Sequence, residues 1–105
     1  MKPPTTPRPA SFEVLGQTFT VEYVDTLKKG VGWCIDTEQR VLIRNAQGPD
    51  QERDTLLHEV LHAALKVAGV RVGSSKSEEA MVRGLAPVLL DVLRSSPELV
   101  GFLLA

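Results

Sequence analysis

The stretch Gln51-Glu52-Arg53-Asp54-Thr55-Leu56-Leu57-His58-Glu59-Val60-Leu61-His62-Ala63-Ala64-Leu65 decides the fold. Its apolar residues recur at helical spacing. Pro49, just before it, is a favourable first helical residue, and the Asp50 carboxylate lies where the helix dipole favours negative charge. Gly69 is a typical residue for ending a helix. The sequence therefore predicts a helix that begins at Pro49 and runs to about Val67.

This helix contains the pattern H-E-x-x-H, written here as His58-Glu59-Val60-Leu61-His62. Residues four apart share one face of a helix, so both imidazoles can point at one ion. They are the only two histidines in the chain. Zinc is the natural ion for two imidazoles that leave one position open for water. Glu59 can reach that water as a general base, which predicts hydrolysis of an amide bond.

A catalytic zinc site of this kind needs a third protein ligand. The chain has no third histidine, which excludes the metzincin pattern and leaves a carboxylate. Glu78 and Glu79 stand at the start of the next predicted helix. That helix opens with Ser75-Lys76-Ser77-Glu78, which fits a capping box, with Ser77 as the alternative cap. Periodicity alone does not choose between the two glutamates.

The residues before the motif helix predict a small sheet. Apolar and polar residues alternate along residues 18–24, which is the period of a half-buried strand. Further short strands are predicted at residues 12–15, 33–35 and 40–44, the last two forming a hairpin. Phe19 and Trp33 are predicted to be core residues, and Cys34 a small buried hydrophobe. We therefore expect an α+β domain with a mostly antiparallel sheet of three to four strands.

The composition is that of one ordinary globular domain. The chain has 105 residues, of which 43% are hydrophobic and 24% charged, with a formal net charge of −1. This balance predicts neither a nucleic acid nor a membrane as partner. A single cysteine and the lack of an apolar leader-like segment favour the cytoplasm. Four prolines in residues 1–10 predict a flexible arm, followed by one domain over residues 11–105.

The motif, the preceding sheet and the following glutamate-bearing helix resemble the gluzincin branch of zinc metallopeptidases. More closely, they resemble the small ImmA/IrrE-type domains of bacteria, phages and mobile elements. In that family the metal glutamate opens a second helix and precedes an Ala-rich apolar pattern. The matching stretch here is Glu79-Ala80-Met81-Val82-Arg83-Gly84-Leu85-Ala86. The resemblance covers about residues 32–93 and implies a zincin-like fold, with His58, His62 and Glu79 as zinc ligands and Glu59 as base.

The chain also departs from the family. Val82-Arg83 stands where the family often has Ala-Asn. No histidine remains to assist an oxyanion, so Tyr23, Arg83 and Arg71 are the candidates for that role.

Three functions remain open at this point. The first is a zinc metallopeptidase that holds a peptide or protein substrate by strand addition beside residues 40–44. The second is a catalytically weak or inactive zinc-binding interaction module of a phage or mobile-element system. The third is a helical adaptor without metal, in which His58 and His62 are simply polar residues. The apolar residues 99–104 fit either ordinary packing or a contact with a partner.

Overall fold

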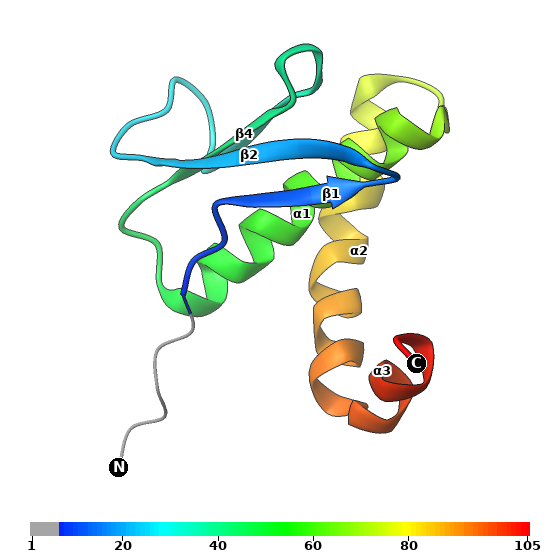
Figure 1. Cartoon of the computed structure of the whole chain (residues 1–105). Coiled ribbons are helices and arrows are strands. Elements are labelled where there is room, and N and C mark those ends of the chain that lie inside the picture. Colours follow the sequence, from blue (N-terminus) through cyan, green and yellow to red (C-terminus); the bar gives the residue numbers. More distant parts are fainter. Residues whose placement is uncertain (1–6) are drawn as a thin grey trace.

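The first half of the chain folds into a four-stranded mixed sheet (Figure 1). The structure is a computed structural model that describes residues 7–105. The strands are β1 (Ser11–Val14), β2 (Gln17–Val24), β3 (Gly32–Ile35) and β4 (Arg40–Arg44). β1–β2 and β3–β4 pair antiparallel, whereas β2–β4 pair parallel. With the three helices that follow, this sheet confirms the predicted α+β class.

The strand order is β1-β2-β4-β3, which places β3 at the edge of the sheet. The loop after β2 carries the chain to this outer position, and the hairpin then returns β4 to lie beside β2. A short 3-10 helix, Asp36–Glu38, forms the hairpin turn. The prediction that residues 40–44 are the strand available to a peptide is therefore wrong. β4 has a partner on both sides, whereas β1 and β3 are the two edge strands of the described sheet, and β3 is the edge that lines a cleft with the helix α1 (Pro49–Ala68).

One face of the sheet is covered by α1, and the other two helices pack beyond it. α1 packs on the strands, α2 (Ser75–Ser95) packs mainly on α1, and α3 (Pro97–Leu103) packs on α2 (Figure 1). The predicted ends of α1 are confirmed. Pro49 is its first residue, and Gly69 caps it at a positive φ of 70°. None of the helices within residues 7–105 combines the length and apolarity needed to cross a membrane.

The core lies between the sheet and α1. Alternate residues of β2 and β4 face the helix, as the period of a strand requires. The buried apolar residues are Phe19, Val21, Val41, Ile43, Ala63, Val82 and Ala86. The prediction for Phe19 is confirmed. The prediction for Trp33 is wrong, because its side chain is 54% exposed. Its neighbour Cys34 packs towards the core. Because successive strand residues face opposite sides of the sheet, the Trp33 side chain faces away from the core.

The predicted arm, residues 1–10, lies partly outside the described residues, which begin at 7. Its described end contacts the domain. The Tyr23 hydroxyl donates to the Pro9 carbonyl at 2.7 Å, and the Arg8 guanidinium lies 3.7 Å from the centre of the Tyr23 ring. A guanidinium over an aromatic face is an attractive cation–π contact. The chain is therefore held against the sheet from Arg8 onward.

Candidate metal centre

His58 and His62 lie one turn apart on α1 and turn their rings towards each other. Their ring centroids are 4.9 Å apart, and their Nε2 atoms are 3.2 Å apart. Both side chains are largely buried, with 17% and 15% of their surfaces exposed. The spacing of four residues sets this convergence within a single helix. Two imidazole nitrogens therefore face one point.

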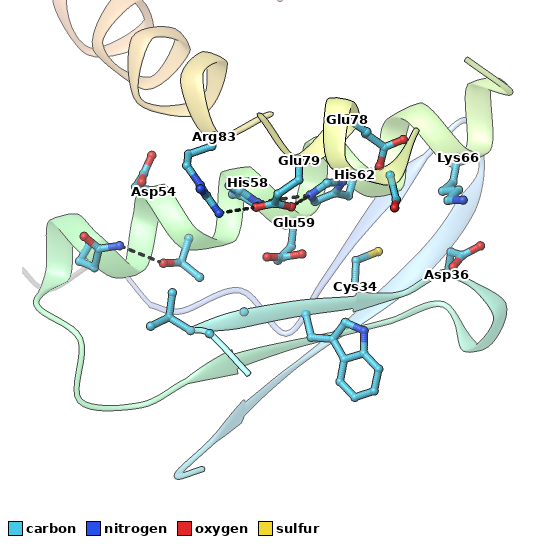
Figure 2. Close-up of a pocket in the computed structure, with 17 residues that line it drawn as sticks. Cys34, Asp36, Asp54, His58, Glu59, His62, Lys66, Glu78, Glu79 and Arg83 are labelled. Atoms are coloured by element: carbon cyan, nitrogen blue, oxygen red, sulfur yellow. Dashed lines mark hydrogen bonds and ion pairs between the residues drawn. The ribbon is translucent and has the colours of Figure 1, made fainter. Parts of the chain in front are cut away.

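Glu79 brings a carboxylate from α2 to the same point (Figure 2). One of its oxygens lies 2.9 Å from Nε2 of His58, and the other lies 2.8 Å from Nε2 of His62. One ligand atom from each of the three residues lies within 4.8 Å of the other two. The structure therefore brings together the three residues that the sequence predicted as metal ligands.

Glu78 does not join this cluster, although sequence periodicity did not separate it from Glu79. Its Oε2 atom lies 2.7 Å from Nδ1 of His62, the ring nitrogen on the other side from Nε2. The predicted cap of α2 was also wrong by one residue. Ser74 is the N-cap, and its side chain accepts from the backbone N–H of Ser77. Glu78 is therefore one residue too far along the helix to close a capping box.

Glu59 extends from α1 into the cleft above β3 (Figure 2). It is 6% exposed, and it lies so close to β3 that a Cβ atom on Gly32 would stand 2.8 Å from its Oε2. Burial raises the pKa of Glu59 to about 7, with an opposing contribution from the charge of His62 and a further rise from that of Glu79. A carboxyl group with this pKa can accept and release a proton near neutral pH.

The two histidines have different proton affinities. Burial lowers the pKa of His58, although the charge of Glu79 opposes this shift. Burial also acts to lower the pKa of His62, but hydrogen bonds with Glu78 and Glu79 outweigh it and raise the pKa overall. The reason is that two carboxylates contact His62, one at each nitrogen. His62 therefore contacts two carboxylates, whereas His58 contacts only that of Glu79.

A cleft of about 580 Å³ runs between α1, the start of α2 and the edge strand β3. Trp33 and Cys34 line its β3 side. Cys34 faces the core, so the exposed Trp33 ring lies on the other face of β3. Desolvation raises the pKa of the Cys34 thiol to about 12, which keeps it protonated and unreactive. Sequence reasoning missed the place of Trp33 because a short strand does not reveal which of its faces is covered.

The three candidates for assisting an oxyanion lie in different places. The Tyr23 hydroxyl is bonded to Pro9, in a second pocket formed with the N-terminal arm. Arg71 does not line the cleft, whereas Arg83 does. Arg83 lies 3.4 Å from Glu79, the carboxylate of the cluster. Arg83 is therefore the one of the three that the structure brings to the site.

The donor set fits zinc. Two imidazoles and one glutamate are a known ligand set of catalytic zinc sites. Ligands about 2.1 Å from a tetrahedral ion stand about 3.4 Å from one another. The Nε2 atoms of His58 and His62 are 3.2 Å apart, close to this spacing, and one ligand atom from each of the three residues lies within 4.8 Å of the other two.

No protein-family model, curated protein or solved structure matches the chain. Any assignment of function therefore depends on the geometry of the cluster and on the chemistry of its residues.

Proposed function

We propose that this protein is a zinc-dependent metallopeptidase with Glu59 as its general base. The observation that carries the proposal is the convergence of His58, His62 and Glu79 from two helices, with the Glu59 carboxylate beside them. A cluster formed only from exposed acidic groups would be weaker support, because such groups often gather without a metal. Here all three ligands are partly buried and line a cleft.

The residues around the cluster divide the chemistry between them. Zinc, when bound, would acidify a water molecule and polarise the carbonyl of the substrate. The Glu59 carboxylate, which lines the cleft with the three ligands, would take the proton from the water and later give it to the leaving amine. The Glu59 side chain is buried, so the cleft shields its carboxylate from bulk solvent. His58, His62 and Glu79 would hold the ion.

The edge strand β3 suggests how a peptide would bind. β3 is paired on one side only, and its residues line the same cleft as Glu59. An extended peptide can add to such an edge through backbone hydrogen bonds. The exposed Trp33 ring, on the face of β3 away from α1, then offers an apolar surface for a cross-strand side chain of the peptide. We therefore propose an extended peptide or protein segment as the substrate.

One observation favours a second function, a zinc-binding interaction module with weak or no catalysis. Among residues 7–105, Arg83 is the one predicted oxyanion partner that reaches the site, and it already contacts Glu79. If Arg83 stays with Glu79, only the ion would stabilise the negative charge that develops on the carbonyl oxygen of the substrate. Metal binding would remain, and the chain would act by binding a partner within a phage or mobile-element system.

Metal analysis and one substitution separate these functions. The purified wild type should carry close to one zinc per chain after dialysis, and it should cut members of a mixed peptide library. Glu59→Gln should keep the zinc and abolish cleavage, because an amide cannot accept the proton. Zinc without cleavage in the wild type would favour the interaction module. A wild type that takes up no zinc and shows no thermal shift with added zinc would contradict both functions.

A further inference from the structure

Glu78 makes a contact that neither the helix nor the proposed reaction requires. It is the fourth residue of α2, and its side chain is 17% exposed. Its carboxylate lies across the helix contact, 2.7 Å from Nδ1 of His62 on α1. Glu79, the next residue, contacts Nε2 of the same ring at 2.8 Å. Two adjacent glutamates of α2 therefore hold opposite nitrogens of one histidine.

The helix itself does not need the Glu78 carboxylate. The start of α2 is capped by Ser74, whose side chain accepts from the backbone N–H of Ser77. The backbone N–H of Glu78 donates to the Ser74 carbonyl. With these groups satisfied, the Glu78 side chain is available for a tertiary contact. It is partly buried beside His62 although an exposed position would keep it hydrated, so the contact must offset a desolvation cost.

We propose that Glu78 is a positioning residue for His62, an inference that rests on the proposed metal site. A neutral imidazole carries its proton on one nitrogen and can bind an ion only through the other. The Glu78 carboxylate accepts the proton of Nδ1 in a hydrogen bond. This bond leaves the lone pair on Nε2, the nitrogen that faces His58 and Glu79, and it fixes the rotation of the ring.

This arrangement assigns different tasks to the two glutamates. Glu79 contacts both histidines at the nitrogens that converge, so it is a ligand. Glu78 contacts only the outer nitrogen of His62, so it acts on the ion through the ring. Loss of a carboxylate in this position typically weakens metal binding by about 10- to 100-fold. Loss of a ligand should weaken it further and lower the amount of zinc retained.

Zinc affinity measured by competition with a chromogenic chelator tests the proposal without using catalysis. Glu78→Ala should bind zinc about 10- to 100-fold more weakly than the wild type while still binding one ion per chain. Glu78→Gln should recover part of the affinity, because its amide oxygen can still accept the Nδ1 proton. Glu98→Ala is the matched control, since Glu98 lies in the first turn of α3 and is exposed. It should bind zinc as the wild type does.

A second measurement reports the proton itself. In the zinc-loaded wild type, long-range 1H–15N correlation spectra should place the His62 proton on Nδ1 and the metal on Nε2. Glu78→Ala should show a mixture of the two arrangements or a broadened His62 signal. Circular dichroism would confirm that each variant is folded.

Two results would overturn the assignment. One is a Glu78→Ala protein that matches the wild type in zinc affinity. The other is a Glu78→Ala protein that binds no zinc while Glu79→Ala still binds it, which would make Glu78 the ligand. Failure of the proposed function gives a different pattern, because the wild type itself would then bind no zinc.

Discussion

Gly32 is the residue whose replacement should most directly disturb the contact between β3 and α1. A Cβ atom added to Gly32 would lie 2.7 Å from Cγ2 of Thr55 and 2.8 Å from Oε2 of Glu59. Both neighbours are buried, and the Thr55 hydroxyl is held by a 2.7 Å hydrogen bond to Gln47. Neither side chain can move aside freely, so alanine at this position should push the edge strand away from the helix.

The expected cost follows from these distances. Carbon atoms in ordinary contact are about 3.5–4.0 Å apart, so the strand must move by about 1 Å. Overpacking of this kind typically costs about 1–3 kcal/mol. Removing a glycine from the unfolded chain returns about 0.4–1 kcal/mol, and Gly32 has no positive φ that alanine would resist. Gly32→Ala should therefore be about 1–2 kcal/mol less stable than the wild type.

Urea denaturation followed by circular dichroism measures this difference, with Gly84→Ala as the matched control. Gly84 lies within α2, and a Cβ atom added there would meet no other side chain within 4 Å. Alanine there should stabilise the protein by about 0.5–1 kcal/mol, because glycine is a poor residue for a helix interior. Gly32→Ala should also lose peptide cleavage while keeping zinc, since Glu59 is displaced and the ligands are not. A Gly32→Ala protein as stable as Gly84→Ala would refute the reasoning.

Three further predictions concern the cluster and its rim. In the presence of a chelator, Glu59→Gln should be more stable than the wild type above pH 7, by up to about 3 kcal/mol. The sign follows because the folded pKa of Glu59, about 7, lies above the ordinary 4.5. Ionisation of Glu59 therefore lowers the free energy of unfolding of the wild type, increasingly from pH 4.5 to 7. In paired urea titrations at pH 4.5 and 8, the free energies of unfolding of the two proteins should converge at the lower pH. His62→Ala should lose zinc, so the stabilisation of about 2.7 kcal/mol that zinc at 100 times its Kd gives the wild type should disappear from thermal melts. Trp33→Ala should change stability by less than about 0.5 kcal/mol, because the ring is exposed, but should raise KM for cleaved peptides; an unchanged KM would remove Trp33 from the binding surface.

The features that depend on local sequence were predictable. The motif helix was found with its proline start and glycine end, because both signals act on residues next to them. The alternation in β2 predicted that Phe19 is buried. The His58–His62 pair followed from the spacing of four residues within one helix. Each of these conclusions needs only the geometry of a single element.

The features that depend on pairing between elements were not predictable in this way. Both strands of the β3–β4 hairpin are short and apolar, so periodicity does not say which of them pairs with β2. The exposure of Trp33 depends on that choice. The N-cap of α2 is Ser74 and not the predicted Ser75. This shift of one residue removes Glu78 from the capping-box position and leaves its side chain available to contact His62. Serines at 74, 75 and 77 all have side chains suitable for a cap, so the local pattern did not decide.

The position of the third ligand links metal binding to the fold. His58 and His62 are brought together by α1 alone, but Glu79 arrives only when α2 packs on α1. The buried residues of α2 are Val82 and Ala86, which are small to medium in size and allow the helices to approach closely. An ion held by all three ligands would bridge the two helices, so its binding free energy adds to that of the helix contact. The unfolded chain lacks this contact, and zinc should therefore favour the folded state in proportion to its affinity for the assembled site.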